Sequence, residues 1–210
     1  MEAEPLLREA LQVKRRTLGD SHNSTLTSIN NLGRLLHDQG KLKEAEPLYR
    51  EALEGSRRTL GGTHPSTLIV ITNLGLLLQG QGKLSNAEPL LREALEGSRH
   101  ALGDTHPDTL SNINNLGLLL QDQGKLNKSE PLLREALEAQ RRTHGDTHHE
   151  TLISINNLAS LLQARGKFRE AELLFREAVS SAKKTLGDAD PTTVFLQENC
   201  VRALSKMGKA

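Results

Sequence analysis

The sequence predicts an all-α protein, a right-handed α-solenoid of stacked antiparallel helix pairs. A 42-residue segment repeats along the chain without an insertion. Each copy contains two stretches whose apolar residues recur every three or four positions, the period of an amphipathic helix. Aromatic residues make up only 2% of the 210 residues, so the core must consist of Leu, Ile and Ala. Helix pairs of this kind bury their apolar faces only by stacking on neighbouring pairs.

The repeat divides the whole chain, residues 1–210, into copies of one expected domain. Full copies span residues 18–59, 60–101, 102–143 and 144–185. We name the first helix of each copy the A helix and the second the B helix. Residues 1–17 match a lone B helix, and residues 186–210 match a lone A helix. The stacked pairs are expected to place the A helices on a concave side and the B helices outside.

The A helix of the third copy shows how its ends are encoded. The residue before a proline avoids helical angles, so His106 is expected to cap this helix and Pro107 to begin it. Gly124 is expected to end it, as glycine does just past a helix. One apolar stripe lies between these ends, formed by Leu110, Ile113, Leu116, Gly117 and Leu120.

The B helix carries a second apolar stripe and a recurrent charge pair. In the third copy Glu130 and Arg134 stand four residues apart, a favourable spacing and orientation on a helix. A proline recurs a few residues into this helix, where it is costly unless it lies in the first turn. The B helix is therefore expected to start late or to be kinked. The expected late starts are Glu44, Asn86 and Lys128.

These motifs resemble a tetratricopeptide repeat array. The A-helix core NLGLLLQDQGKL and the B-helix core AEPLLREAL carry small residues where that family has them. These are Gly33, Gly75, Gly117, Ala45 and Ala87. The 42-residue period, with LGDTHPDTL before the A helix and NNLG or NNLA within it, is similar to the kinesin light chain type of repeat. The heptad coiled coil of that family is absent from this sequence, so motor binding is not implied.

The resemblance implies a non-catalytic scaffold that binds an extended peptide or protein segment in the concave groove. In that family asparagines of the A helix hold the peptide backbone, as an amide can both donate and accept hydrogen bonds. The first asparagine of the pair is Asn30, Asn114 or Asn156, and Thr72 replaces it in the second copy. The second asparagine is Asn31, Asn73, Asn115 or Asn157. The alternative is that one asparagine of each pair bridges adjacent helices internally.

One turn further along the A helix, the groove is expected to change from basic to apolar and back. The residues at this position are Arg34, Leu76, Leu118, Ser160 and Arg202. Two leucines between two arginines favour a ligand with an apolar centre and an acidic flank.

Other functional classes find little support in the sequence. The net charge of +1 gives no overall field for nucleic acid, although the basic ends of the B helices could form a local stripe. No apolar run is long enough to span a membrane, and the N-terminus lacks the features of a signal peptide. The lone Cys200 cannot form an internal disulfide, which fits a reducing, cytoplasmic compartment. No catalytic constellation is present, and no cofactor is expected. No metal site is expected either, because the recurring linker histidines stand 42 residues apart, and capping is their expected role. These are His22, His64, His106 and His148.

The ends of the chain leave a second function open. The sequence of the last residues continues in phase into that of the first. The chain is therefore either a fragment of a longer array or a self-assembling structural element. In the second case the lone terminal helices would dock head-to-tail between molecules, a contact that propagates unless the rotation closes a ring.

Overall fold

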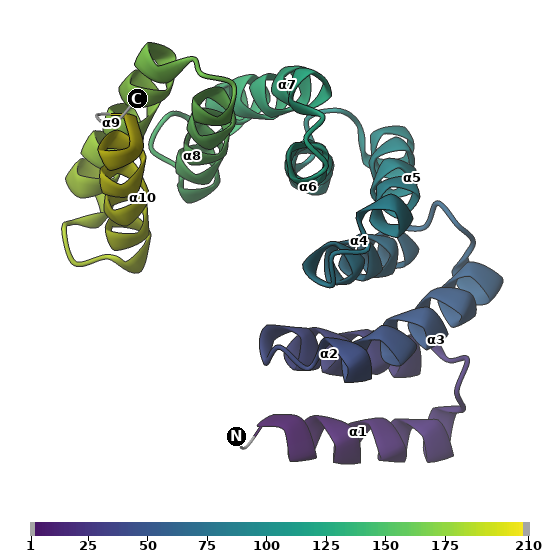
Figure 1. Cartoon of the computed structure of the whole chain (residues 1–210). Coiled ribbons are helices and arrows are strands. Elements are labelled where there is room, and N and C mark those ends of the chain that lie inside the picture. Colours follow the sequence, from purple (N-terminus) through teal and green to yellow (C-terminus); the bar gives the residue numbers. More distant parts are fainter. Residues whose placement is uncertain (1–2, 208–210) are drawn as a thin grey trace. The chain divides into compact units, whose positions relative to one another are not determined.

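The computed structural model describes residues 3–207, with side chains to residue 205, and this part of the chain consists of ten α-helices joined by short turns (Figure 1). The B helices are α1 (Ala3–Leu18), α3 (Leu42–Leu60), α5 (Leu84–Leu102), α7 (Leu126–His144) and α9 (Phe168–Leu186). The A helices are α2 (Asn23–Asp38), α4 (Pro65–Gly80), α6 (Pro107–Asp122), α8 (His149–Ala164) and α10 (Pro191–Met207). Two compact units divide the chain, unit 1 (Met1–Asn112) and unit 2 (Ile113–Ala210).

Histidines cap the A helices α2, α4, α6 and α8, which confirms the role expected for them. The Nδ1 atom of His106 accepts a hydrogen bond from the backbone N–H of Asp108 at 3.2 Å, and α6 begins at Pro107. His22, His64 and His148 make the same bond two residues ahead. An N-cap side chain satisfies one of the N–H groups that the first helical turn leaves unpaired.

A tight glycine turn joins each A helix to its B helix. Gly40 has φ +74°, and its N–H bonds to the carbonyl of His37. The N–H of Lys41 bonds to the carbonyl of Leu36, which completes the Schellman arrangement. Gly124 ends α6 with the same bonds and φ +73°, as the sequence predicts.

The expected late start of the B helices is wrong. These helices begin two residues earlier than predicted, at Leu42, Leu84 and Leu126, so that Pro47, Pro89 and Pro131 lie inside them. The preceding turn fixes the start, because the carbonyl of the capping lysine accepts the first helical N–H, that of Ala45 in α3. The prolines are exposed, so water can reach the carbonyl that each leaves unpaired. Packing of the apolar stripe outweighs this local penalty.

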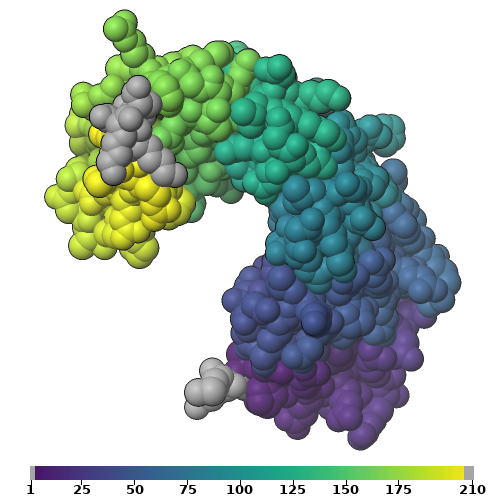
Figure 2. All heavy atoms as spheres, in the orientation of Figure 1, coloured from purple at the N-terminus to yellow at the C-terminus, as the bar shows by residue number. Residues whose placement is uncertain are grey.

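Within unit 1, close packing of each A helix on its B helix depends on glycine. A Cβ atom at Gly75 in α4 would stand 2.7 Å from Cδ2 of Leu91 in α5. A Cβ at Gly33 in α2 would stand 3.0 Å from the ring of Tyr49 in α3, which is fully buried. In Figure 2 the atoms of this part of unit 1, drawn in blue, form a continuous surface.

Unit 2 has the same organisation around a continuous core. Phe175 of α9 and Ile155 of α8 are buried together with Leu196 and Cys200 of α10. Ala159 occupies the A-helix position that glycine holds in the earlier copies. The residues predicted for the third A-helix stripe are all buried. None of the helices within residues 3–207 combines the length and apolar character that a bilayer crossing requires.

We expect Gly75→Val to destabilise the array by about 1–3 kcal/mol, because the added atoms overlap Leu91 in a packed core. Gly80→Ala is the matched control on the same helix, since a Cβ there has no neighbour closer than 3.9 Å. The control should be neutral or stabilise by up to about 1 kcal/mol. Urea unfolding followed by circular dichroism measures both effects. Equal stability of the Gly75→Val variant and the parent would contradict the close approach.

Candidate functional site

A cavity of about 280 Å³ opens between α2 and α4 in unit 1 and contains most of the groove residues predicted there. Its polar lining includes Asn30, Asn31 and Asn73, with Arg34 beside them. Leu26, Ile69 and Val70 supply the apolar lining, which Asn23, Thr27, Ser56 and Ser66 complete. The site is open to solvent and combines amide, apolar and cationic surface.

The asparagines of successive A helices are bonded to one another. Nδ2 of Asn73 in α4 donates to Oδ1 of Asn30 in α2 at 2.9 Å. In unit 2, Asn157 donates to Asn114 at 3.3 Å, and Asn199 donates to Asn156 at 3.2 Å. Each bond joins the second asparagine of one copy to the first asparagine of the preceding copy. The internal bridging that the sequence left as an alternative is therefore present.

Burial separates the two asparagines of the first and fourth copies, whereas Asn114 and Asn115 of the third copy are both half-buried. Asn30 is 8% exposed and Asn156 is 4% exposed, so these first asparagines lie inside the stack. Asn31 is exposed, and Asn73 and Asn157 are half-buried. The bridge uses one N–H of a second asparagine, and an amide has a second N–H and a carbonyl oxygen. In the first and fourth copies the second asparagine is therefore better placed than the first to meet a ligand.

The second copy replaces the bridge with a different pair. The Thr72 hydroxyl donates to Oδ1 of Asn112 at 2.8 Å. The Nδ2 atom of Asn112 lies 3.3 Å from the Ser98 hydroxyl and 3.4 Å from the Ala94 carbonyl. Asn112 is 5% exposed and was missed by sequence reasoning. Its signal is the departure from the Ser or apolar residue that the other copies carry at that position.

The residues one turn beyond the asparagines differ in their exposure. In unit 1, Arg34 is exposed and Leu76 is half-buried. In unit 2, Leu118 and Ser160 are half-buried and Arg202 is exposed. The sequence analysis overlooked Ile69, which is 48% exposed on α4 at the cavity. The available signal was an apolar residue where the first and third copies have Thr27 and Ser111, and the fourth copy also has an isoleucine there, Ile153.

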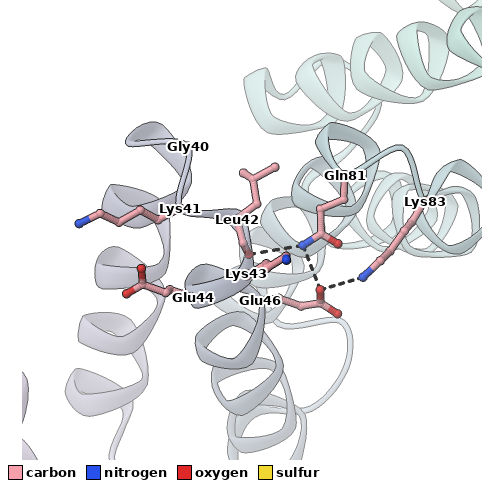
Figure 3. A pocket seen from close by; sticks show the side chains of 8 residues that line it. All are labelled: Gly40, Lys41, Leu42, Lys43, Glu44, Glu46, Gln81 and Lys83. Atoms are coloured by element: carbon pink, nitrogen blue, oxygen red, sulfur yellow. Dashed lines mark hydrogen bonds and ion pairs between the residues drawn. The ribbon is translucent and has the colours of Figure 1, made fainter.

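A second cavity in unit 1, of about 550 Å³, lies at the turn between α2 and α3 and reaches the turn between α4 and α5 (Figure 3). Glu46 stands at its centre, where it accepts hydrogen bonds from Arg50, Gln81 and Lys83. The bonds from Arg50, Lys83 and Gln81 lower the pKa of Glu46 to about 2. Because these donors already satisfy the carboxylate and join two copies, we interpret this cavity as structural.

Ion pairs between successive B helices occupy many of the basic side chains that could have formed an outer stripe. Arg57 of α3 pairs with Glu93 of α5 at 2.7 Å. Arg15 of α1 pairs with Glu51 of α3 at 2.6 Å. In unit 2, Arg141 pairs with Glu177. These acids reduce the positive potential available to nucleic acid on this side.

Comparison with known proteins agrees with this architecture. The family model described as tetratricopeptide repeat matches residues 1–58, 30–100 and 108–184. The crystal structure of a kinesin light chain-like protein from Podosopora anserina, with nearly identical TPR-like repeats, is 28% identical, with a TM-score of 0.76 over 90% of this chain and 89% of that chain. A point variant of that protein is 26% identical, with a TM-score of 0.77 over 89% and 88%.

A third solved structure supports the fold only, because its sequence identity to this chain is lower than that of the first two. BtubC (BKLC) from P. vanneervenii is 22% identical, with a TM-score of 0.76 over 96% of this chain and 80% of that chain. Comparison with curated proteins gives no match. Together with the described helices, these likenesses confirm the all-α solenoid class and the kinesin light chain-like repeat.

The lowered pKa of Glu46 predicts a pH-dependent contribution to stability. Its carboxylate stabilises the fold above the ordinary pKa of 4.5, and this contribution is lost as the pH falls toward about 2. Replacing Lys83 by Met removes one of the donors, so the pKa of Glu46 should rise toward its ordinary value. A carbon-13 NMR titration of the Glu46 carboxyl measures this shift. An identical titration curve in the parent and the variant would contradict the role assigned to Lys83.

Proposed function

The chain belongs to the tetratricopeptide repeat family, and on this premise we propose that it is a non-catalytic scaffold that binds an extended peptide or protein segment along its A helices. Members of this family are generally protein-interaction scaffolds. The observation that supports the proposal best is the cavity between α2 and α4, which is lined by amides of Asn31 and Asn73, the apolar Ile69 and the cationic Arg34.

The chemistry of this cavity suits the backbone of an extended segment. A peptide in extended form presents unpaired N–H and C=O groups that need partners. Asn73 is held in place by its bond to Asn30, so its remaining amide groups are oriented before a ligand arrives. Such preorganisation lowers the entropy cost of binding. An asparagine pairs with peptide groups whatever side chains the peptide carries.

The side chains around the amides set the preference of the groove. Ile69 is 48% exposed and would lose contact with water when it packs against an apolar ligand side chain. Arg34 lies at the same cavity and is exposed, so a carboxylate beside that apolar side chain could pair with it. The ligand that fits unit 1 therefore carries an apolar residue next to an acidic residue. In unit 2, Leu118, Ser160 and Arg202 repeat the combination of apolar, polar and cationic groups.

Head-to-tail assembly is the second candidate function and has its own supporting observation. Leu6 and Val13 of α1 are 63% and 53% exposed, and Val201 of α10 is 68% exposed. Contact between α10 of one molecule and α1 of the next would bury these side chains. Light scattering across a range of concentrations tests this, and a mass that stays monomeric at high concentration contradicts it.

Selection of displayed random peptides on the parent chain tests the groove. We expect the selected peptides to place an apolar residue beside Asp or Glu. Their affinity should fall at least about tenfold for the variants Arg34→Glu and Ile69→Ser, because a charge pair and an apolar contact each contribute about 1–3 kcal/mol. Fluorescence anisotropy measures the affinities.

Lys184→Glu is the matched charge control, because Lys184 is exposed near the end of the B helix α9. It should leave the affinity unchanged. Peptides that bind Arg34→Glu and Ile69→Ser as tightly as the parent would overturn the proposal. Retained helicity of both variants by circular dichroism shows that a loss of binding is not a loss of fold.

A further inference from the structure

In unit 2, three side chains with metal-binding chemistry meet where α7 ends and α8 begins. His144 is the last residue of α7, His148 caps α8, and Glu150 lies in the first turn of α8. One ligand atom from each of the three lies within 4.8 Å of the other two. The two imidazole rings stack with centroids 4.6 Å apart and an interplanar angle of 24°. The turn between the helices therefore gathers two nitrogen ligands and one oxygen ligand.

The fourth copy alone carries this combination. Where it has His144, the other copies have Leu18, Leu60, Leu102 and Leu186. Where it has Glu150, they have Ser24, Ser66, Asp108 and Thr192. The capping function of His148 needs neither substitution, because His22 and His64 cap their helices without them. The sequence argument against a metal considered only the capping histidines, and so it missed His144 four residues before His148.

A neighbouring hydroxyl contacts the ring of His144. Thr143 Oγ1 lies 3.0 Å from the carbonyl oxygen of Ala139 and 3.0 Å from Nδ1 of His144. When the hydroxyl hydrogen goes to the Ala139 carbonyl, Nδ1 of His144 donates the second bond and the lone pair lies on Nε2. Metal-binding histidines are commonly oriented in this way by a hydrogen bond to the other ring nitrogen.

His148 can bind a metal only by giving up its capping bond. Its Nδ1 accepts a hydrogen bond from the N–H of Glu150. A metal on Nδ1 would take the lone pair that accepts this bond, and a metal on Nε2 would require the ring hydrogen to lie on Nδ1 instead. The bond is 3.4 Å long here, against 3.1–3.2 Å for His22, His64 and His106. The longest of the four capping hydrogen bonds is therefore the one that metal binding would break.

The two helix ends beside the cluster act on a cation in opposite directions, since the end of α7 attracts it and the start of α8 repels it. The carboxyl end of α7, where His144 lies, carries partial negative charge, and the amino end of α8 carries partial positive charge. The Glu150 carboxylate stands at that positive end and offsets it. His149 is turned elsewhere, with Nδ1 3.1 Å from the Thr192 hydroxyl of α10.

We propose that His144, His148 and Glu150 form a zinc site that clamps α7 to α8. Two imidazoles and one carboxylate with water in the fourth position match the three-ligand zinc sites of proteins. Bonds of about 2.0–2.1 Å require the ligand atoms to approach to roughly 3.3 Å of one another. The side chains of His144 and Glu150 are partly exposed and that of His148 is exposed, so they can move by this amount.

Titration of the metal-free chain with zinc chloride, followed by calorimetry, tests the site. We expect one dominant site per chain and a zinc-dependent rise in the unfolding temperature, because a metal that binds only the folded chain stabilises it. His144→Leu installs the residue of the other copies and should weaken binding at least about tenfold. Thr143→Val removes the hydroxyl that orients His144 and should weaken binding by about tenfold.

Two asparagine variants separate metal binding from capping. His148→Asn keeps a capping side chain and removes the imidazole, so it should abolish the dominant site while the helix content is retained. His106→Asn makes the same change in the third copy, where Leu102 stands in place of a second histidine, and should leave zinc binding unchanged. Absence of zinc binding by the parent, or undiminished binding by folded His144→Leu, would overturn the proposal.

Discussion

The register between successive A helices is the constraint on which the rest of the structure depends. An amide of one copy meets the amide 43 residues later, as Asn30 meets Asn73 in unit 1 and Asn156 meets Asn199 in unit 2. On the other side of the stack, Lys83 reaches Glu46 at a spacing of 37 residues. Because every copy has the same length, the same spacings recur within each unit, and Lys167 reaches Glu130 across 37 residues in unit 2. In unit 1 this stacking brings α2 and α4 together around the cavity.

Near-identical copies pose a problem of order, because any B helix could pack on any A helix. The interfaces between a B helix and the following A helix differ at one position, where a B-helix residue contacts the A-helix residue 14 positions later in the chain. Lys14 donates to the Ser28 hydroxyl at 2.7 Å at the first interface. At the third, Asn112 takes the place of that serine and lies 3.3 Å from the Ser98 hydroxyl. A mismatched pair would leave a buried polar group without its partner, which costs about 1–3 kcal/mol. Differences between copies therefore contribute to a single order of stacking.

The sequence predicts those features that depend on local chemistry. The helix pairs, the cap at His106 and the stop at Gly124 were predictable because each depends on residues within one or two turns. The bond between Lys83 and Glu46 was not, since the period does not specify how one copy packs on the next. The burial of Asn30 depends on that packing too, so the groove asparagines could be named from the resemblance but their burial could not be predicted. The helix start ahead of Pro47 was mispredicted because tertiary packing outweighed a local rule.

A double-mutant cycle between Asn30 and Asn73 tests this register most directly. The free energy of unfolding would be measured for the parent, for Asn30→Ala, for Asn73→Ala and for the double variant. A bridge at 2.9 Å predicts a coupling energy of about 0.5–1.5 kcal/mol between the two positions. Additive effects, with no coupling, would show that the amides do not meet and would contradict the stacking on which the groove depends.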